Sequence, residues 1–300
     1  MGEKTSKKKL FLVITIAAVV CVVIAAFFII RKYTPLPTEE EFINFNSLEN
    51  ILQKKESLYI QQKNILEGQE EKVVQICYYE YADGQINMYN WMVGNPIEDL
   101  LYNGFHYRIY QDRVYAVCEK SAQSFSAMLE IFSNYARYPD SAGTERPKPQ
   151  KLERNGDEYL LSYSWKTYYD TNINTHDLSF RFAKDWSCKE IKLVEDDMTT
   201  IYSFEYGNKK SYFDIAKNMK QTEYIEIDVT NVSEPKRSFG PCKIPLDMYV
   251  WIEHITQAEL YTDSACTQFY QAAVPVGPNA WITEEPVVQD LSLYLRETYE

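Results

Sequence analysis

The feature that most constrains this chain is an apolar run at residues 10–30. It holds 21 residues and no charged side chain. A helix of that length rises about 30 Å, which is the thickness of a bilayer's hydrocarbon core. The run therefore predicts a single N-terminal transmembrane helix and places the rest of the chain beside a membrane.

The flanking charges predict which side the rest of the chain occupies. Basic residues stand on both sides of the run: Lys4, Lys7, Lys8 and Lys9 before it, Arg31 and Lys32 after it. Short positive tails stay in the cytoplasm. Residues 1–9 are thus predicted to be a cytoplasmic tail, residues 10–30 the anchor, and the following region extracellular at the cell membrane.

Two kinds of processing remain alternatives to a retained anchor. A cleaved signal peptide has a shorter apolar run that ends on small residues, whereas this run ends on Phe27, Phe28, Ile29 and Ile30. A bacterial lipoprotein signal has a small residue directly before the lipidated Cys, whereas Val20 precedes Cys21. Both comparisons favour a retained, unlipidated helix.

Composition indicates a folded domain beyond the anchor. The chain is 45% hydrophobic and 25% charged, close to the average of globular proteins. Its 25 Tyr and 14 Phe favour β-strands, where aromatic side chains pack across a pleated surface. The net charge of −12 argues against a nucleic-acid partner, because phosphates require a basic surface.

The first folded region is predicted to begin with a helix after a spacer at residues 31–37. Thr38 and Glu41 have capping-box spacing, and apolar residues then recur at helical intervals at Phe42, Phe45, Leu48, Ile51 and Leu52. Strands are predicted at 58–66, 72–81, 85–93, 105–110 and 114–118, with a hairpin turn at Asp83-Gly84. An amphipathic helix follows at 125–135, and then a Pro-containing loop at 138–150.

A second meander is predicted after the turn at Asn155-Gly156. Its alternating side chains place one set on an apolar face: Tyr159, Leu161, Tyr163 and Trp165, then Leu178, Phe180 and Phe182. Further strands are predicted at 187–194 and 199–206. One apolar face and one solvated face are typical of an antiparallel sheet in water.

The remaining sequence predicts a separate C-terminal module. The pattern breaks after Gly207, so we place a boundary near Gln221. Residues 38–221 are predicted to form the main domain, and residues 222–300 a small β module. The predicted class is therefore α+β, mainly antiparallel β, with a curved open sheet packed on one or two helices.

The cysteines leave the disulfide pattern open. Cys21 lies in the anchor, and the other five are an odd number, so at least one has no intrachain partner. Cys242 and Cys266 are the candidate pair, because both lie in the small C-terminal module, which a disulfide would stabilise. The alternative is that all are ordinary half-buried thiols.

Catalytic motifs are missing from the sequence. His106, His176 and His254 lie far apart and show no metal-ligand spacing. The chain has no nucleophile elbow, zinc-binding helix or phosphate-binding Gly loop. We therefore expect no enzyme, cofactor or metal, and an unrecognised hydrolase is the alternative.

The order of elements over residues 40–206 resembles the half-barrel of the lipoprotein-carrier family. The resemblance includes the leading helix, the inserted helix and a meander that ends in Phe180-Arg181-Phe182 and Tyr202-Ser203-Phe204. It implies an open sheet curved around helices, whose apolar face holds acyl chains or lipidated partners. Tyr163, Trp165, Phe180 and Phe182 would then line the cavity; alternatively, these rings only fill the core.

A second resemblance concerns the C-terminal module. Residues 260–270 and 290–295 are similar to the closing half of Listeria-Bacteroides surface repeats, which are small β modules on bacterial surface proteins. The Gly-x-x-Phe-x-Gly-Trp segment usual in those repeats is missing. This resemblance implies a bacterial surface protein.

Two functions follow from these observations. The first is a membrane-anchored extracytoplasmic protein that binds or senses an apolar group of a lipid, a lipoprotein or a peptide. The alternative is a surface interaction or structural protein that acts through protein–protein contacts. Neither involves nucleic acid, and the membrane is a partner through the N-terminal helix.

Overall fold

The structure is a computed structural model that describes residues 20, 22–24, 41, 45–118, 151–169, 172–217, 223–253, 258–276 and 280–297. The chain divides into two units, residues 1–42 and 43–300. The predicted anchor at 10–30 lies outside the described residues except for positions 20 and 22–24, which are helical. In the described part, no helix combines the length and apolar character needed to cross a membrane.

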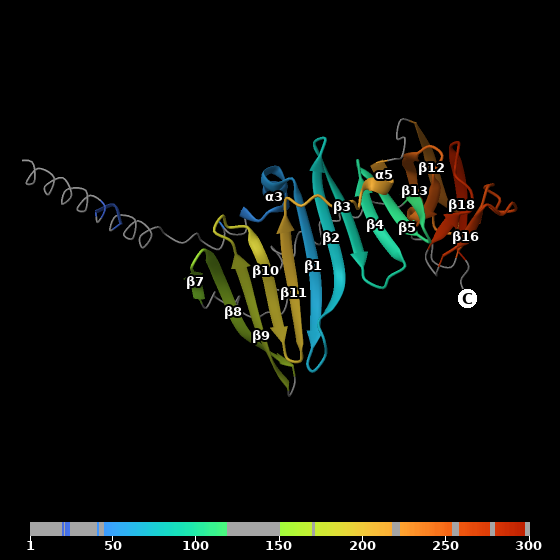
Figure 1. The fold of residues 1–300 in the computed structure, drawn as a ribbon. Helices are drawn as coiled ribbons and strands as arrows, with labels where there is room; N and C mark the ends of the chain where they lie inside the picture. Colours follow the sequence, from blue (N-terminus) through green and yellow to red (C-terminus); the bar gives the residue numbers. More distant parts are fainter. Residues whose placement is uncertain are drawn as a thin grey trace, which may run out of the picture. The chain divides into compact units, whose positions relative to one another are not determined.

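Two antiparallel meanders build most of the second unit, as their alternating side chains predict. The first contains β1 (Ser57–Leu66), β2 (Lys72–Ala82), β3 (Gln85–Met92), β4 (Ile97–Tyr102), β5 (Phe105–Tyr110) and β6 (Arg113–Cys118). The second contains β7 (Lys151–Asn155), β8 (Glu158–Tyr169), β9 (Asn172–Phe182), β10 (Cys188–Glu195) and β11 (Met198–Tyr206). β1 pairs with β11 and joins both meanders in one sheet (Figure 1).

The C-terminal strands divide between two sheets. β12 (Tyr224–Asn231), β13 (Phe239–Pro245), β15 (Ala258–Tyr261) and β18 (Leu291–Glu297) form a four-stranded sheet. β14 (Tyr249–Ile252), β16 (Ala273–Pro275) and β17 (Trp281–Thr283) extend the large sheet, because β14 runs parallel to β6. The large sheet thereby reaches 14 strands, and the predicted mainly antiparallel α+β class is confirmed. The predicted domain boundaries stay a prediction.

The turns follow their predicted chemistry. Asp83 and Gly84 have φ of 52° and 79°, the left-handed conformation that a tight hairpin requires. The sequence interpretation missed β4, although Asn103-Gly104, with φ of 50° and 81°, gives the same signal between β4 and β5. The sequence therefore contained a turn signal that could have predicted β4.

Only part of the predicted helical content can be compared with the structure. α3 (Leu48–Lys55) buries Leu48, Ile51 and Leu52, as its stripe predicts, and contacts β1 and β2. Two short helices follow, α5 (Asp214–Lys217) and the 3₁₀ helix η3 (Pro235–Arg237). The amphipathic helix predicted at 125–135 and the loop predicted at 138–150 lie outside the described residues.

The large sheet has buried side chains on both of its faces. Tyr78 and Tyr107 lie on one face and belong to a core that also contains Ile227 of β12. Tyr79, the residue next to Tyr78, points to the opposite face and is only 1% exposed. β2 therefore reads as a nearly continuous apolar run, which is typical of strands buried on both sides.

A disulfide joins Cys118, at the end of β6, to Cys242 in β13. The predicted Cys242–Cys266 pair is therefore wrong, and Cys266 is a buried free thiol in the turn after β15. Cys242 and Cys266 are much closer in sequence than Cys118 and Cys242, but β13 packs beside β6 and brings the Cα atoms of Cys118 and Cys242 to 5.5 Å from each other. Cys77 and Cys188 are also buried and are not part of a disulfide.

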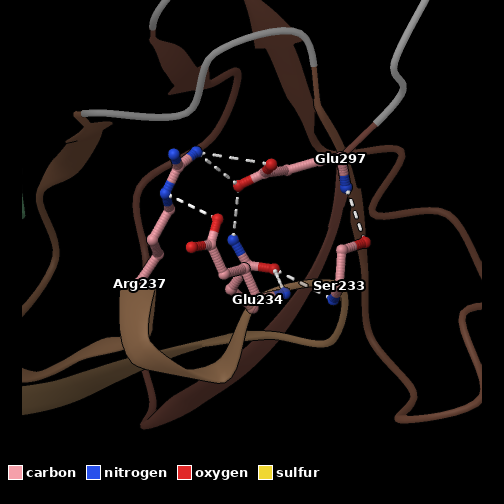
Figure 2. A network of polar contacts seen from close by, with 5 residues as sticks. Ser233, Glu234, Arg237 and Glu297 are labelled. Carbon is pink, nitrogen blue, oxygen red and sulfur yellow. Dashed lines mark hydrogen bonds and ion pairs between the residues drawn. The ribbon is translucent and has the colours of Figure 1, made fainter.

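A polar network fastens the ends of β12 and β18 (Figure 2). The Asn231 amide donates to Glu297 over 2.7 Å, and Arg237 binds both Glu297 and Glu234. The Asn231 side-chain oxygen accepts the backbone N–H groups of Ser233 and Glu234. Asn231 begins an Asn-x-Ser sequence, yet this residue is only 3% exposed and serves as an internal hydrogen-bonding bridge.

Replacing both Cys118 and Cys242 by Ala should strongly destabilise the chain. The crosslink spans 124 residues in sequence. A loop of this size restricts the unfolded chain enough to stabilise folding by about 4 kcal/mol. Urea unfolding with and without a reductant measures the effect. The parent chain should lose comparable stability in reductant, and the variant should not respond; equal responses would contradict the prediction.

Candidate ligand-binding face

The four residues predicted to line a cavity lie together on one face of two neighbouring strands. Tyr163 and Trp165 come from β8, and Phe180 and Phe182 from β9. Directly opposite residues of an antiparallel pair share a face. The register sets Tyr163 opposite Leu178, and the rings of Tyr163 and Phe180 meet edge to face at 6.0 Å. We call this side of β8–β11 and β1 the aromatic face.

Cross-strand rows of side chains make up the aromatic face. The inner rows contain Leu161, Phe180, Ile191 and Tyr202, and then Tyr163, Leu178, Leu193 and Thr200. All of these residues are at most 7% exposed. Phe180 and Phe182, each 1% exposed, are therefore packed in the core, and their role as ligand contacts stays a prediction.

The last row at one end of the strands is less buried. It consists of Trp165, His176, Glu195, Met198 and Leu66, which stand opposite one another across β8, β9, β10, β11 and β1. We call these five residues the rim row. Leu66 is 41% exposed, and the other four are half-buried. The aromatic face thus runs from a closed core to a partly open end.

Polar and stacking contacts fix the side chains of the rim row at the open end of the aromatic face. The indole of Trp165 stacks on the imidazole of His176, with ring centres 5.0 Å apart and planes 9° from parallel. The Nδ1 atom of His176 lies 2.8 Å from Glu195 Oε1. The side chain of Glu195 remains 30% exposed. The rim row therefore combines an aromatic platform, a carboxylate and two apolar side chains.

Asn46 lies at the end of the aromatic face opposite the rim row, which we call the closed end. Its amide donates to the Trp186 carbonyl over 2.8 Å and accepts the Cys188 N–H over 2.7 Å. The Trp186 ring stacks on Tyr159 at 3.6 Å. These contacts attach the residues just before α3 to the turn between β9 and β10. Figure 1 shows α3 at the end of the strands away from the turn between β10 and β11.

A second polar cluster lies farther along the same side of the sheet, on β4, on β5 and directly after β14. Arg108 bridges Asp99 and Glu253, and His106 Nε2 lies 3.2 Å from Asp99. Burial opposes ionisation of Asp99, but the hydrogen bonds from His106 and Arg108 outweigh it and lower the pKa of this carboxyl. Asp99 is therefore an ionised partner of two basic groups, which indicates a structural role.

A pocket of about 230 Å³ lies between β5, β6 and β13, with His106 and Lys243 in its wall. This volume is below that of pockets for drug-sized ligands, which start at about 300 Å³. Within the described ranges, no group of three His, Cys, Asp or Glu side chains could hold a metal ion. We therefore take the aromatic face as the candidate site.

Sequence reasoning missed several residues of this site. It did not place His176, Glu195, Met198 and Leu66 beside Trp165. The sequence predicts which side chains of one strand share a face. It does not predict which residues of the neighbouring strands stand beside Trp165, because that depends on the register of four strand pairs.

Comparison with known proteins finds distant matches among solved structures. No family model and no curated protein matches this sequence. The LprF structure from Mycobacterium bovis has 10% identity and a TM-score of 0.32, covering 59% of this chain and 96% of that chain. The lipoprotein LppX from Mycobacterium tuberculosis has 8% identity and a TM-score of 0.27, covering 58% and 98%.

A LolA superfamily protein from Nitrosomonas europaea is also similar. It has 6% identity and a TM-score of 0.25, and the match covers 57% of this chain and 92% of that chain. Likenesses this distant do not establish a function. What we propose below therefore rests on the geometry of the aromatic face.

Replacing Asn46 by Ala should destabilise the closed end. The Cys188 N–H and the Trp186 carbonyl would both lose a partner next to a buried residue. We expect the free energy of unfolding to fall by about 2 kcal/mol. Urea unfolding measures the loss. Gln53→Ala, on the exposed side of α3, is the control and should change the free energy of unfolding little. Equal effects of the two substitutions would contradict a stabilising role of the Asn46 hydrogen bonds.

Acid should weaken the contact between Lys55 and Asp185. Lys55 Nζ lies 2.7 Å from Asp185, and with Ser187 it lowers the pKa of Asp185 from 3.8 to about 2. A carboxyl whose pKa is lowered on folding stabilises the fold only while it is ionised. Asp185→Asn should therefore destabilise the chain above pH 3.8, and its difference from the parent should vanish as the pH falls through about 2. Urea midpoints across this range measure the difference; a constant difference would contradict the assignment.

Proposed function

We propose that this chain is a membrane-anchored extracytoplasmic protein whose aromatic face binds an apolar group, and that it catalyses no reaction. The apolar group belongs to a lipid, a lipidated protein or a peptide. The observation that carries the proposal is the change in burial along the aromatic face, from rows at most 7% exposed to the partly open rim row.

The rim row suits entry of an apolar group. Leu66, Met198 and the Trp165 ring offer apolar surface at the open end, and Tyr163 and Leu193 continue it inward. Burying such surface is favourable by about 25 cal/mol per Å². An entering chain would contact the rim row first and then the row behind it.

The disulfide and the N-terminal run support the proposed location. Disulfides such as Cys118–Cys242 persist in oxidising compartments outside the cytoplasm. The apolar run at residues 10–30 has the length of a membrane span. Both features fit a protein held at the cell membrane with its folded region on the extracellular side.

A second candidate function is protein–protein contact through the C-terminal strands. Phe269 is 54% exposed and stacks on Tyr261 at 4.7 Å, and Val288 is 63% exposed. Exposed aromatic side chains are common at interfaces. Crosslinking of the full chain on cells, compared with Phe269→Ser, tests this function: a partner that is kept by the variant would exclude this surface.

Charging the rim row should impair apolar binding. Binding is measured with the neutral fluorescent probe N-phenyl-1-naphthylamine. Leu66→Glu should weaken binding of the probe by about tenfold, because a carboxylate at the open end disfavours apolar contact. Ile65→Glu is the matched control, since Ile65 lies next to Leu66 and points to the opposite face. Fluorescence titration of full-length chains measures both.

Organic extraction and mass spectrometry of the purified chain provide a second readout. A co-purified apolar molecule should be depleted in Leu66→Glu and kept in Ile65→Glu. Equal probe binding by the two variants, or no binding by the parent chain, would refute the aromatic face as the site.

A further inference from the structure

The pocket between β5, β6 and β13 reaches the disulfide from one side. Its volume is about 230 Å³, and Cys242 is part of its wall. Cys242 is half-buried, whereas Cys118 is 0% exposed and does not line the pocket. The two sulfur atoms of this bond therefore differ in their access to a molecule from solvent.

This difference decides which sulfur an incoming thiol can attack. In thiol–disulfide exchange, a thiolate bonds one sulfur and displaces the other. Attack from the pocket forms a new S–S bond to Cys242 and breaks the bond to Cys118, which leaves as a thiolate and takes up a proton from solvent. The products are a mixed disulfide on Cys242 and a buried thiol at Cys118.

The size of the pocket limits the incoming thiol. Water occupies about 30 Å³ per molecule in the liquid, so the pocket has room for roughly seven waters. A thiol with a few non-hydrogen atoms fits this space. Ala116 and Ile244 in the wall belong to the core and are at most 2% exposed, so close packing holds the wall in place.

A lysine beside Cys242 favours a negatively charged thiol. Lys243 also lines the pocket, and its ammonium group lies 4.5 Å from the centre of the Tyr224 ring. Glu226 stands opposite Lys243 in the strand pairing, and Asp228 lies against the start of β13. Of these three charged side chains, only Lys243 is in the pocket wall. Its charge attracts the thiolate, which is the attacking form of a thiol.

We propose that Cys242 is a site of reversible S-thiolation, at which a small thiol that carries a carboxylate or a sulfonate enters the pocket and opens the Cys118–Cys242 bond. The reaction needs no binding at the aromatic face, so it is independent of the proposed function. It removes the covalent connection between β6 and β13 while the thiol stays attached.

The strand pairing makes this modification reversible. Cys118 stays beside Ile252, because β6 pairs with β14, and Cys242 stays beside Ile227, because β13 pairs with β12. Both strands contribute to one buried core. The released thiol of Cys118 is therefore held near the mixed disulfide, where it reacts as an intramolecular group. Once free thiol is removed, Cys118 attacks Cys242, expels the small thiol and restores the crosslink.

The test treats the purified full-length chain with 2-mercaptoethanesulfonate under native conditions. Acid quenching, alkylation in denaturant and peptide mapping by mass spectrometry then locate the modification. In the initial phase, the adduct should be on Cys242 and the alkyl group on Cys118. Removal of the thiol by desalting should restore the original disulfide. No adduct, adducts on Cys118 as often as on Cys242, or an adduct that persists after desalting would overturn the proposal.

The dependence on urea separates reaction through the pocket from reaction of the unfolded chain. The rate of adduct formation should stay constant at urea concentrations below the unfolding transition, because the pocket exists in the folded chain. Reaction that requires global unfolding would accelerate steeply with urea, since urea raises the unfolded population. Such an acceleration would overturn the proposal.

Two variants test the role of Lys243. Lys243→Gln should slow the reaction of 2-mercaptoethanesulfonate by about threefold and should not slow the cationic thiol cysteamine. Lys192→Gln is the matched control, because Lys192 is exposed on β10, which neighbours neither β6 nor β13. Added salt should reduce the effect of Lys243→Gln. Equal rates for the two variants would overturn the preference for anionic thiols, and urea unfolding checks that both are folded.

Discussion

The pairing of β1 with β11 is the contact on which the aromatic face depends. It joins residues more than 130 positions apart, from Leu58 opposite Tyr206 to Leu66 opposite Met198. Without it, each meander would end in an open edge with unpaired backbone groups. The pairing also places Leu66 beside Met198. A one-residue slip would move every β1 side chain to the opposite face.

The sequence predicted local structure well because local structure depends on nearby residues. Asp83-Gly84 and Asn155-Gly156 marked hairpins, and the alternation from Tyr159 to Trp165 marked the apolar face correctly. β4 was missed although Asn103-Gly104 supplied the turn signal. Such patterns are set by backbone conformation and by period, and both can be read along the chain.

Long-range contacts could not be predicted in the same way. Nothing near Cys242 indicates Cys118 as its partner, and proximity in sequence pointed to Cys266. The strands β14, β16 and β17 likewise join the large sheet through β6, although they follow the predicted start of a separate module. These contacts arise from packing, which one sequence does not display.

The parallel contact between β14 and β6 has a consequence for biosynthesis. Synthesis proceeds from the N-terminus, so β6 is complete long before Tyr249–Ile252 leaves the ribosome. During that interval the edge of β6, which carries Val114, Val117 and Cys118, has no strand beside it. An uncovered apolar edge is a template for aggregation. The nascent protein would therefore keep this edge exposed until Tyr249–Ile252 has been synthesised.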